Sequence, residues 1–400
     1  MSLLEPGSEA EAATLIAAAT EPLRLEGGGT RAGLGRPIQT AATLTSRGLA
    51  GITLYEPAEM VIGARAGTPL AEIEAALAEK SQMLTFEPMD HRPLFGSPRG
   101  DSEGEPTIGA VAAGNISGPR RIFGGAARDS LIGVRFVNGR GEIIKSGGRV
   151  MKNVTGLDLV KLQAGAFGTL GFLTEVIFKV LPKPAATTTL VFSGLDEARA
   201  VEFMCAAMGT PFEITGAAHL PAGLGADKAR TLLRLEGFPE QLDYRGGRLA
   251  DQFSAFGAPG RIDGDAGAML WRSVRDVRPL VEPLDRAVWR LNLPPRTGAA
   301  TVAAIRRGLA ATDLRVLYDW SGGLVWLATA ETGDAGEAAI RGAAREAKGH
   351  ATLVRGSPEL RARVAVFEPE PTAVATLTRG LKSSFDPKGL LNPGLMHPGA

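Results

Sequence analysis

The sequence predicts an α+β protein in which a glycine-rich N-terminal domain is followed by a second domain built on one antiparallel sheet. Three glycine-rich clusters lie before Pro184, and after it an order of strand, helix, strand, strand, helix and strand occurs twice. The 400 residues, with 44% hydrophobic and 22% charged side chains, are enough for two or three domains with cores of their own. We expect a first domain over residues 1–184, a second over 185–360 and a C-terminal segment over 361–400.

Local signals define the elements of the first domain. Ser8 and Glu11 form a capping box ahead of a helix that runs to about Ala19. Pro69 opens another helix, because the first helical position needs no N–H group. Asn138-Gly139 is a hairpin signal between two apolar strands. The expected strands are 22–25, 52–55, 60–66, 131–137, 142–144 and 172–180, and a further helix of small residues is expected at 108–113.

The second domain is expected to contain two split-βαβ units in tandem, which together form one antiparallel sheet backed by helices. The repeat is one of pattern and not of residue identity. The first unit has strands at 187–192, 213–219, 230–236 and near 261, with helices at 196–208 and 239–256. The second has strands at 287–293, 314–320, 324–329 and 351–355, with helices at 299–311 and 336–348. A last helix is expected at about 374–385.

Charge and composition exclude several classes of function. Lys and Arg number 44 against 43 Asp and Glu, and a net charge of +1 provides no general field for nucleic acid or an anionic membrane. The single cysteine, Cys205, excludes an internal disulfide and a cysteine-ligated zinc or iron–sulfur site held by this chain alone. The 4 histidines are not paired at metal-ligand spacing, so no metal site is expected. The start lacks the features of a signal peptide and no apolar run reaches about 20 residues, so we expect a cytoplasmic protein that contacts membranes only through partners.

The three glycine clusters are the candidate ligand-binding segments. Gly27–Gly35 follows a strand, and consecutive glycines can turn their N–H groups to one side and approach a phosphate closely. This cluster has neither P-loop nor Rossmann spacing, and the alternative is a flexible turn. Thr107–Gly124 adds Arg120 as a candidate phosphate partner, with close helix packing and solvated arginines as the alternative. The third cluster combines Lys152–Leu159 with Gly165–Glu175, where a glycine-lined loop again leads into a strand.

Together these segments resemble the FAD-binding proteins of the vanillyl-alcohol oxidase type, which carry a PCMH-type FAD-binding domain. The matches are G-G-G-T at 27–30, T-I-G at 107–109, G-x-x-x-R-D at 124–129, K-N-V-T-G-L-D-L at 152–159 and G-T-L-G-F-L-T-E at 168–175. Residues 385–394 are similar to a family segment that folds back beside the flavin; a helix stop before an exposed terminus is the alternative. Segments 288–294, 318–323 and 349–352 extend the resemblance over nearly the whole chain, toward the flavin-binding subunits of bacterial glycolate oxidases.

The resemblance implies non-covalent FAD, because the glycine loop contains no His or Cys. A cap domain of two βαββαβ-like halves would cover the flavin. Valine at Gly28 or Gly109 is expected to abolish FAD retention, because its Cβ would occupy the space of the cofactor. Asp90–Pro106 departs from the family as an insertion whose contacts the sequence leaves open. The implied cofactor contacts are Gly27, Gly28, Gly29, Thr30, Arg31, Pro88, Thr107, Ile108, Gly109, Gly114, Asn115, Gly118, Arg120, Gly124, Lys152, Gly168, Thr169, Leu170, Gly171 and Asn392.

The implied function is that of an FAD-dependent oxidoreductase subunit in a complex that oxidises the 2-hydroxy acid glycolate to glyoxylate. Its partners would be a second FAD-containing subunit with the main substrate site and an iron–sulfur subunit. Catalytic relatives carry a histidine-rich metal segment in the cap that is missing here, which favours a supporting or electron-relaying role. Two alternatives stay open: a self-sufficient dehydrogenase of 2-hydroxy acids, and a scaffold with a vestigial flavin site. The candidate catalytic residues are His350 as a base and Arg290 as a carboxylate clamp, each with a structural alternative.

Overall fold

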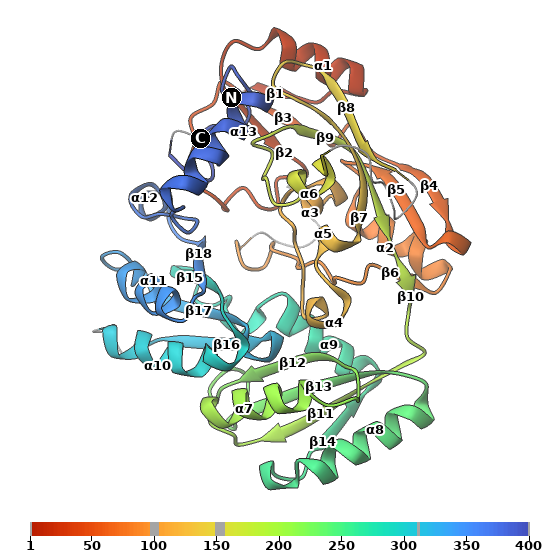
Figure 1. Ribbon diagram of the computed structural model, residues 1–400, viewed down its shortest axis with the longest axis vertical. Coiled ribbons are helices and arrows are strands. Elements are labelled where there is room, and N and C mark those ends of the chain that lie inside the picture. Colours follow the sequence, from red (N-terminus) through yellow and green to blue (C-terminus); the bar gives the residue numbers. More distant parts are fainter. Residues whose placement is uncertain (1, 97–103, 149–156, 310–312, 399–400) are drawn as a thin grey trace.

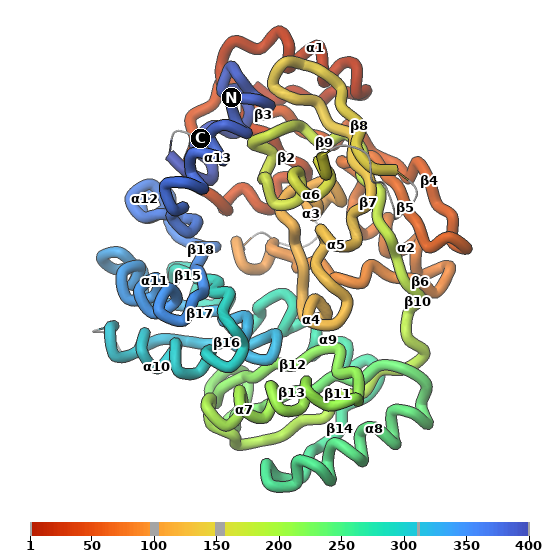
Figure 2. Tube along the Cα trace, in the orientation of Figure 1, coloured from red at the N-terminus to blue at the C-terminus, as the bar shows by residue number. Residues whose placement is uncertain are grey.

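The computed structural model describes residues 2–96, 104–148, 157–309 and 313–398. The glycine-rich first domain and the antiparallel cap domain are stacked along the long axis of the molecule (Figure 1). The chain then returns to the first domain, where the last helix, α13 (Thr372–Phe385), lies near the N-terminus (Figure 1). The tube in Figure 2 shows the same path, with both ends of the chain at the top.

The first domain contains two main sheets. A parallel sheet has the order β1-β3-β2, and an antiparallel sheet has the order β4-β5-β9-β7-β8. The strands are β1 (Ser2–Leu4), β2 (Leu23–Glu26), β3 (Ala42–Thr45), β4 (Ile52–Glu56), β5 (Val61–Arg65), β7 (Leu131–Val137), β8 (Ile143–Gly147) and β9 (Phe172–Lys179), with β6 (Gln82–Met83) and β10 (Leu181–Pro182) as a separate pair. The helices are α1 (Glu9–Ala18), α2 (Leu70–Glu79), α3 (Ile108–Ala113), α4 (Arg121–Gly124), α5 (Ala127–Ser130) and α6 (Leu159–Gln163).

Several local predictions are confirmed in this domain. The Ser8 hydroxyl accepts a hydrogen bond from the Glu11 N–H at 3.1 Å and caps α1. Helix α2 follows Pro69, and Leu70, Ile73 and Leu77 are its buried residues. Strands β7 and β8 form the hairpin predicted around Asn138-Gly139. Capping residues, helical spacing and turn residues act between positions close together in sequence, so the elements that they specify can be predicted without the tertiary contacts.

The cap domain is a single sheet of eight strands in the order β14-β11-β13-β12-β16-β17-β15-β18, as the doubled pattern predicted. Every pairing in it is antiparallel, and the two halves are mirror images in strand order. The first half contains β11 (Ala186–Ser193), α7 (Glu197–Met208), β12 (Ile214–Leu220), β13 (Arg230–Gly237), α8 (Pro239–Gln252) and β14 (Gly260–Asp263). The second contains β15 (Arg286–Asn292), α10 (Gly298–Gly308), β16 (Arg315–Asp319), β17 (Leu324–Ala330), α11 (Glu337–Glu346) and β18 (His350–Arg355). Because β10 ends at Pro182 and β11 starts at Ala186, we propose residue 184 as the division between the domains.

The two faces of the cap sheet have different partners. Phe192, Trp289 and Leu327 point to one face and belong to a core shared with residues of α7, α10 and α11. Residues on the other face, among them Leu317 and Trp326, belong to a core that continues into the first domain. The inner face of the cap sheet is therefore fixed against the first domain.

Some elements were not predicted. Helix α9 (Gly264–Arg275) follows β14, and its buried residues are Gly267, Trp271 and Val274. Glycines at its start and in its first turns hide the helical signal. The predicted helix 239–256 ends at Gln252 and is followed by a 3-10 turn, because Gly257 at φ +101° stops it. Strands β1 and β3 and helices α4, α5, α6 and α12 (Pro358–Arg363) were also missed; none of them is longer than six residues.

His219 occupies the seam between the two halves, where its register partner on β16 is Tyr318. The side chain is fully buried, and its Nδ1 lies 2.9 Å from the Thr231 hydroxyl. Burial lowers the pKa of His219 from 6.5 to about 4. Between these pH values the imidazole of His219 is protonated in the unfolded chain and neutral in the folded chain. The free energy of unfolding therefore decreases as the pH falls from 6.5 to 4.

We expect the free energy of unfolding to decrease by up to about 3 kcal/mol from this group as the pH falls from 6.5 to 4. His219→Gln keeps a hydrogen-bonding side chain and cannot titrate, so its urea-unfolding free energy should decline less over the same range. A decline equal to that of the unmodified chain would show that His219 does not titrate as described.

Candidate functional site

A pocket with about 900 Å³ of empty space, its open mouth included, lies where three segments of the first domain meet the C-terminal part of the chain. The segments are the loop after β2, helix α3, the turn before β9 and the residues after α13. Among the predicted contacts, those that line the pocket are Gly27, Gly28, Gly29, Thr30, Arg31, Gly109, Gly114, Gly168, Gly171 and Asn392. The three glycine clusters, separated by about 140 residues, thus converge on one cavity.

The first glycine loop presents unpaired N–H groups. Its carbonyl oxygens are held by side chains: the Thr45 hydroxyl donates to Gly27 O at 2.8 Å, and Arg47 Nη2 donates to Gly28 O at 3.0 Å. Within the part of the chain that the structure describes, the N–H groups of residues 27–31 donate no hydrogen bond. A row of free backbone donors beside glycines is what a pyrophosphate requires.

Helix α3 forms one wall of the pocket through its small residues. Ala110 and Ala113 line the pocket and are half-buried, whereas Val111 and Ala112 are buried in the core. The helix is fixed at its start, because the Gly109 N–H donates to Ala66 O at 2.9 Å. The pocket therefore has an apolar side in addition to its row of N–H groups.

The expected reason for the effect of valine at the glycines was wrong. A Cβ at Gly109 would lie 2.5 Å from Ala66 Cβ, and a Cβ at Gly28 would lie 1.8 Å from Glu105 O. Both atoms belong to the protein, so valine would push α3 and the glycine loop away from their neighbours instead of filling the cofactor space. These glycines allow segments of the chain to approach each other.

The C-terminal segment closes the pocket through Asn392. Leu391 pairs with Leu23 as a parallel bridge, which places the segment beside β2. The Asn392 amide accepts a hydrogen bond from the Leu25 N–H at 2.8 Å and donates to Phe167 O at 2.9 Å. Lys382 and Asp386 form a buried ion pair at 2.7 Å that holds the turn before this segment. One side chain therefore connects β2, the turn before β9 and the returning chain.

Arg31 is held at the pocket by His91, a residue that the sequence did not single out. Arg31 Nε donates to His91 Nδ1 at 3.2 Å and Nη2 donates to Met89 O at 3.3 Å, while Nη1 is buried without a partner within the described residues. Burial and Arg31 lower the pKa of His91 to about 3, and burial lowers the pKa of Arg31 to about 10. The neutral His91 thus orients the Arg31 guanidinium, whose Nη1 has no hydrogen-bond partner among the described residues.

The described ends of the Asp90–Pro106 insertion pack on the glycine loop. A Cβ at Gly33 would lie 2.8 Å from the ring of Phe95, and a Cβ at Gly104 would lie 1.7 Å from Gly28 O. The insertion therefore supports the outer side of the loop that the family resemblance assigns to the cofactor. The sequence contained no signal for this, because the contact joins residues about 70 positions apart.

The remaining predicted contacts do not line the pocket. Gly118 and Gly124 pack against residues 85–87: a Cβ at Gly118 would lie 2.3 Å from Glu87 O, and one at Gly124 would lie 3.0 Å from Thr85 O. Asn115 accepts a hydrogen bond from the Arg128 N–H at 2.9 Å. Lys152 lies outside the described residues. The other predicted contacts are buried and are not part of the pocket lining: Pro88, Thr107, Ile108, Thr169 and Leu170.

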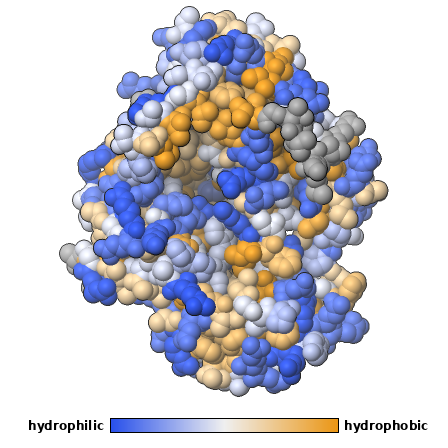
Figure 3. All heavy atoms as spheres, in the orientation of Figure 1, coloured by the Kyte–Doolittle hydropathy of each residue, from blue (hydrophilic) through white to orange (hydrophobic). Residues whose placement is uncertain are grey.

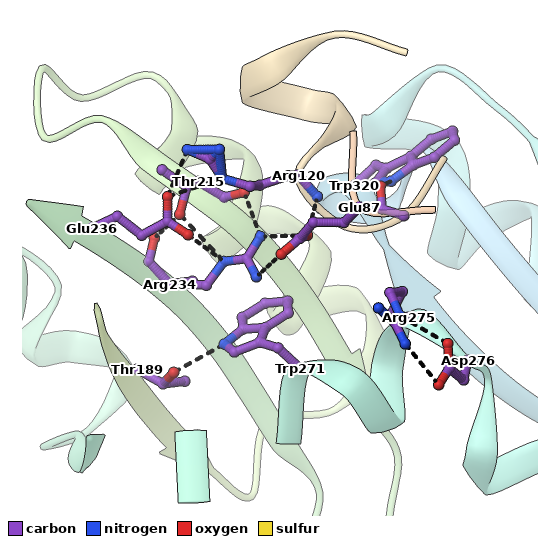
Figure 4. A network of polar contacts seen from close by, with 11 residues as sticks. Glu87, Arg120, Thr189, Thr215, Arg234, Glu236, Trp271, Arg275, Asp276 and Trp320 are labelled. Carbon is purple, nitrogen blue, oxygen red and sulfur yellow. Dashed lines mark hydrogen bonds and ion pairs between the residues drawn. The ribbon is translucent and has the colours of Figure 1, made fainter. Parts of the chain in front are cut away.

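Arg120 is not placed as a phosphate partner, and this prediction is corrected. Its guanidinium pairs with Glu236 of β13 at 2.7 Å, and its N–H donates to Glu87 at 3.0 Å. Glu87 in turn receives two hydrogen bonds from Arg234, at 2.8 and 2.9 Å. Figure 4 shows this network of two arginines and two glutamates, with Trp271 below Arg234. The network joins the first domain to the cap. Arg120 was predicted to bind phosphate because the sequence shows only the glycines around it, and not its carboxylate partners.

The two candidate catalytic residues lie on neighbouring strands of the cap. Arg290 of β15 stacks on Trp320, with its Cζ 5.3 Å from the ring centroid, instead of on the adjacent Trp289. His350 at the start of β18 is exposed, and its Nε2 lies 3.0 Å from Asn292 Nδ2. Desolvation and the charge of Arg290 lower the pKa of His350, so it is neutral near pH 7. Both side chains belong to the same end of the sheet, and their roles stay predictions.

The fit to a dinucleotide rests on the pocket itself. Free N–H groups at the glycine loop and the unpaired Nη1 of Arg31 suit a pyrophosphate, and the alanine wall of α3 suits a flat apolar ring. Together with the fold, these features define an FAD-binding oxidoreductase of the PCMH type. The family model described as an FAD binding domain matches residues 2–147.

Similarity to known proteins identifies the family to which the whole chain belongs. It is 34% identical over 377 residues to the glycolate oxidase subunit GlcE of Escherichia coli (strain K12), covering 94% of this chain and 93% of that protein. The chain belongs to the family of that subunit. It is also 36% identical over 152 residues to the glycolate oxidase subunit GlcD of Bacillus subtilis (strain 168), covering 38% of this chain and 30% of GlcD. The fold matches p-cresol methylhydroxylase with substrate bound at a TM-score of 0.74 and 15% identity, over 99% of this chain and 88% of the other.

The described residues lack two further features. None of the helices there has the length and apolarity needed to cross a bilayer. No group of three or more His, Cys, Asp or Glu side chains in the same residues is arranged to hold a metal ion.

Proposed function

We propose that the chain is the FAD-binding subunit of a glycolate oxidase complex, which oxidises glycolate to glyoxylate. The observation that carries this is the convergence of all three glycine clusters on one pocket, in a chain that matches a glycolate oxidase subunit over nearly its full length. FAD, when bound, supplies a two-electron acceptor for the oxidation of a hydroxy acid. We assign the pyrophosphate of FAD to residues 27–31. We assign the isoalloxazine ring and the adjoining part of the cofactor to the wall formed by Ala110, Ala113 and Asn392.

The role within the complex is support or electron relay, with the main substrate site on a second FAD-containing subunit. This division rests on the sequence, in which the 4 histidines are not paired at metal-ligand spacing. The match to GlcD of Bacillus subtilis supports a related flavin-binding chain as the partner. An iron–sulfur subunit would supply redox centres that one cysteine cannot ligate, and any attachment to the inner membrane would be peripheral, through the complex.

The test is an absorption spectrum of the purified chain before and after addition of glycolate. We expect the visible bands of oxidised flavin, unchanged by glycolate alone and bleached when the second flavin subunit is added with substrate. Bleaching by glycolate alone would instead make the chain a dehydrogenase in its own right. A colourless chain that still assembles the complex would favour the scaffold interpretation.

A further inference from the structure

Helix α13 is attached to the first domain through a small part of its surface. Of its 14 residues, only Lys382 is buried. The Lys382 Nζ donates to Thr169 O at 2.8 Å and to Leu391 O at 2.6 Å, so the helix is held from one side. A helix of this length is only marginally stable in water without tertiary packing, and a partner on its exposed side would therefore stabilise it.

The exposed side of α13 is apolar and almost uncharged. Val374, Leu377 and Leu381 are 45%, 69% and 40% exposed, and their spacing of three and four residues places them on one stripe of the helix. Arg379 is the only charged residue among the exposed positions of α13, which contains no Asp or Glu. A helix that faces water usually carries its charged residues on that side. We call Val374, Leu377, Gly380 and Leu381 the α13 face.

Gly380 lies in the interior of this exposed helix, where the fold itself does not require a glycine. Apart from the backbone of the helix, no atom of the described residues lies within 4 Å of a Cβ placed there. Glycine in a helix interior costs about 1 kcal/mol relative to alanine. Its missing side chain is an advantage where the backbone of a second helix approaches closely. Ala373 and Ser384, which are also exposed, continue the strip of small residues in both directions.

A groove beside the α13 face shares a wall with the cofactor pocket. It contains about 700 Å³ of empty space, its open mouth included, and its lining includes Thr378, Leu381 and Met396. Residues 164–166, 169 and 170 of the turn before β9 line the groove, whereas residues 167, 168 and 171 of the same turn line the pocket. One turn of chain thus separates the two cavities. Figure 3 shows a band of hydrophobic side chains across the upper part of the molecule, where Figure 1 places α13 and α6.

Aromatic rings extend from the cofactor pocket to the groove. Phe167 lines the pocket, and its ring centroid lies 5.1 Å from that of Phe367. The Phe367 ring lies 6.2 Å from the ring of His397, which lines the groove. A protein bound in the groove would therefore be connected to the flavin through packed side chains, which favours a partner that exchanges electrons with it.

We infer that the α13 face and the groove beside it dock the second flavin-containing subunit, through a helix whose contact side is apolar and uncharged. The identity of this partner rests on the proposed function. Transient encounters are steered by charged surfaces, whereas the centre of a permanent interface is depleted of charge, as the α13 face is. The partner is therefore a permanent subunit and not a diffusing electron carrier.

The area of the α13 face argues against a second copy of this chain. A stable interface buries about 800 Å² on each partner, and three partly exposed aliphatic side chains supply only a fraction of that area. Two copies packed α13 against α13 about a twofold axis would leave the groove outside the contact. A different subunit can fill the face and the groove together, and its own flavin then lies on the side of this chain from which the cofactor pocket is one turn away.

The test titrates the full chain, purified with FAD, with the purified second flavin-containing subunit and follows binding by calorimetry. Leu377→Glu and Leu381→Glu should each weaken binding at least tenfold, because the docked complex would bury a carboxylate without a partner. Gly380→Leu should also weaken it at least tenfold by holding the helices apart, although leucine favours the helix of the isolated chain. Met269→Glu and Gly342→Leu are the matched controls, since Met269 is 63% exposed on α9 and Gly342 is exposed on α11. Both should bind the subunit as the unmodified chain does.

Four results would overturn the inference. Unchanged affinity in both glutamate variants would show that α13 is not part of the contact. A dimer of the isolated chain that Leu377→Glu dissociates, measured by light scattering, would assign the face to a second copy. Loss of the iron–sulfur subunit from the complex, with the second flavin-containing subunit still bound, would assign it to that subunit. Binding to phosphatidylglycerol vesicles that Leu377→Glu abolishes would assign it to a membrane surface.

The flavin content and thermal unfolding of each variant are compared with those of the unmodified chain, and substitutions at exposed positions should change neither. An unmodified chain that does not bind the second flavin-containing subunit at all would contradict the proposed function. An unmodified chain that binds it, with glutamate variants that bind equally well, would contradict this inference alone.

Discussion

Ala110→Leu should give a folded chain that purifies without flavin. Ala110 lines the pocket on the half-buried side of α3, so the added carbons enter the space that the cofactor needs and do not enter the core. Overpacking of this kind costs about 1–3 kcal/mol when neighbours can adjust, and more when the displaced group is a rigid ring. We expect FAD affinity to fall by about 100-fold, measured by FAD titration of the apoprotein.

Ala75→Leu is the matched control, because Ala75 is exposed on α2 and the same substitution there adds the same carbons outside the pocket. It should retain FAD fully. Ala113→Leu, one turn further along α3, should repeat the loss. Normal flavin content in both α3 variants would show that this wall of the pocket does not face the cofactor.

Arg234→Met should destabilise the protein by about 3–5 kcal/mol, because it leaves buried carboxylates without their cation. The Arg234 side chain is 4% exposed and binds both oxygens of Glu87, lies 3.5 Å from Glu236 and stacks on Trp271 at 4.6 Å. Methionine fills most of the volume and restores none of the charge. The measurement is the free energy of unfolding in urea, followed by tryptophan fluorescence, since Trp271 reports on this region.

Arg261→Met provides the comparison. Arg261 also contacts two carboxylates, Asp243 and Asp263, but its side chain is 44% exposed and water screens the pair. Its loss should cost about 1 kcal/mol or less. Equal effects of the two substitutions would show that the network between the domains contributes no more than a surface ion pair.

The fold could be predicted to the extent that local patterns determine it. The Asn138-Gly139 hairpin, the Ser8 cap and the doubled strand and helix pattern of the cap depend on residues near each other in sequence, and all are confirmed. Helix α9 was missed because its glycines lower helical propensity, while the packing of Trp271 over β11 fixes it. Helix α9 is thus stabilised by burial against another part of the chain, and such burial cannot be seen in a single sequence.

The residues of the site also fall into those that local sequence predicts and those that depend on distant contacts. Glycine spacing and family resemblance selected the loop at 27–30 and Asn392, which line the pocket. Arg120 was misjudged because its partner Glu236 lies 116 residues away, and nothing near Arg120 in sequence indicates that carboxylate. His91 went unnoticed for a related reason: its role depends on which side chains the fold brings beside it.

Asn392 ties the turn at Phe167 to β2, two segments about 140 residues apart, and itself lies 367 residues from Leu25. Contacts of such long sequence separation form late, since the intervening chain must first be ordered. A cofactor that enters this pocket therefore binds a nearly finished fold and, by mass action, stabilises all of it. Flavin content in a preparation is accordingly a measure of how many molecules have completed folding, and not only of how well the glycine loop binds.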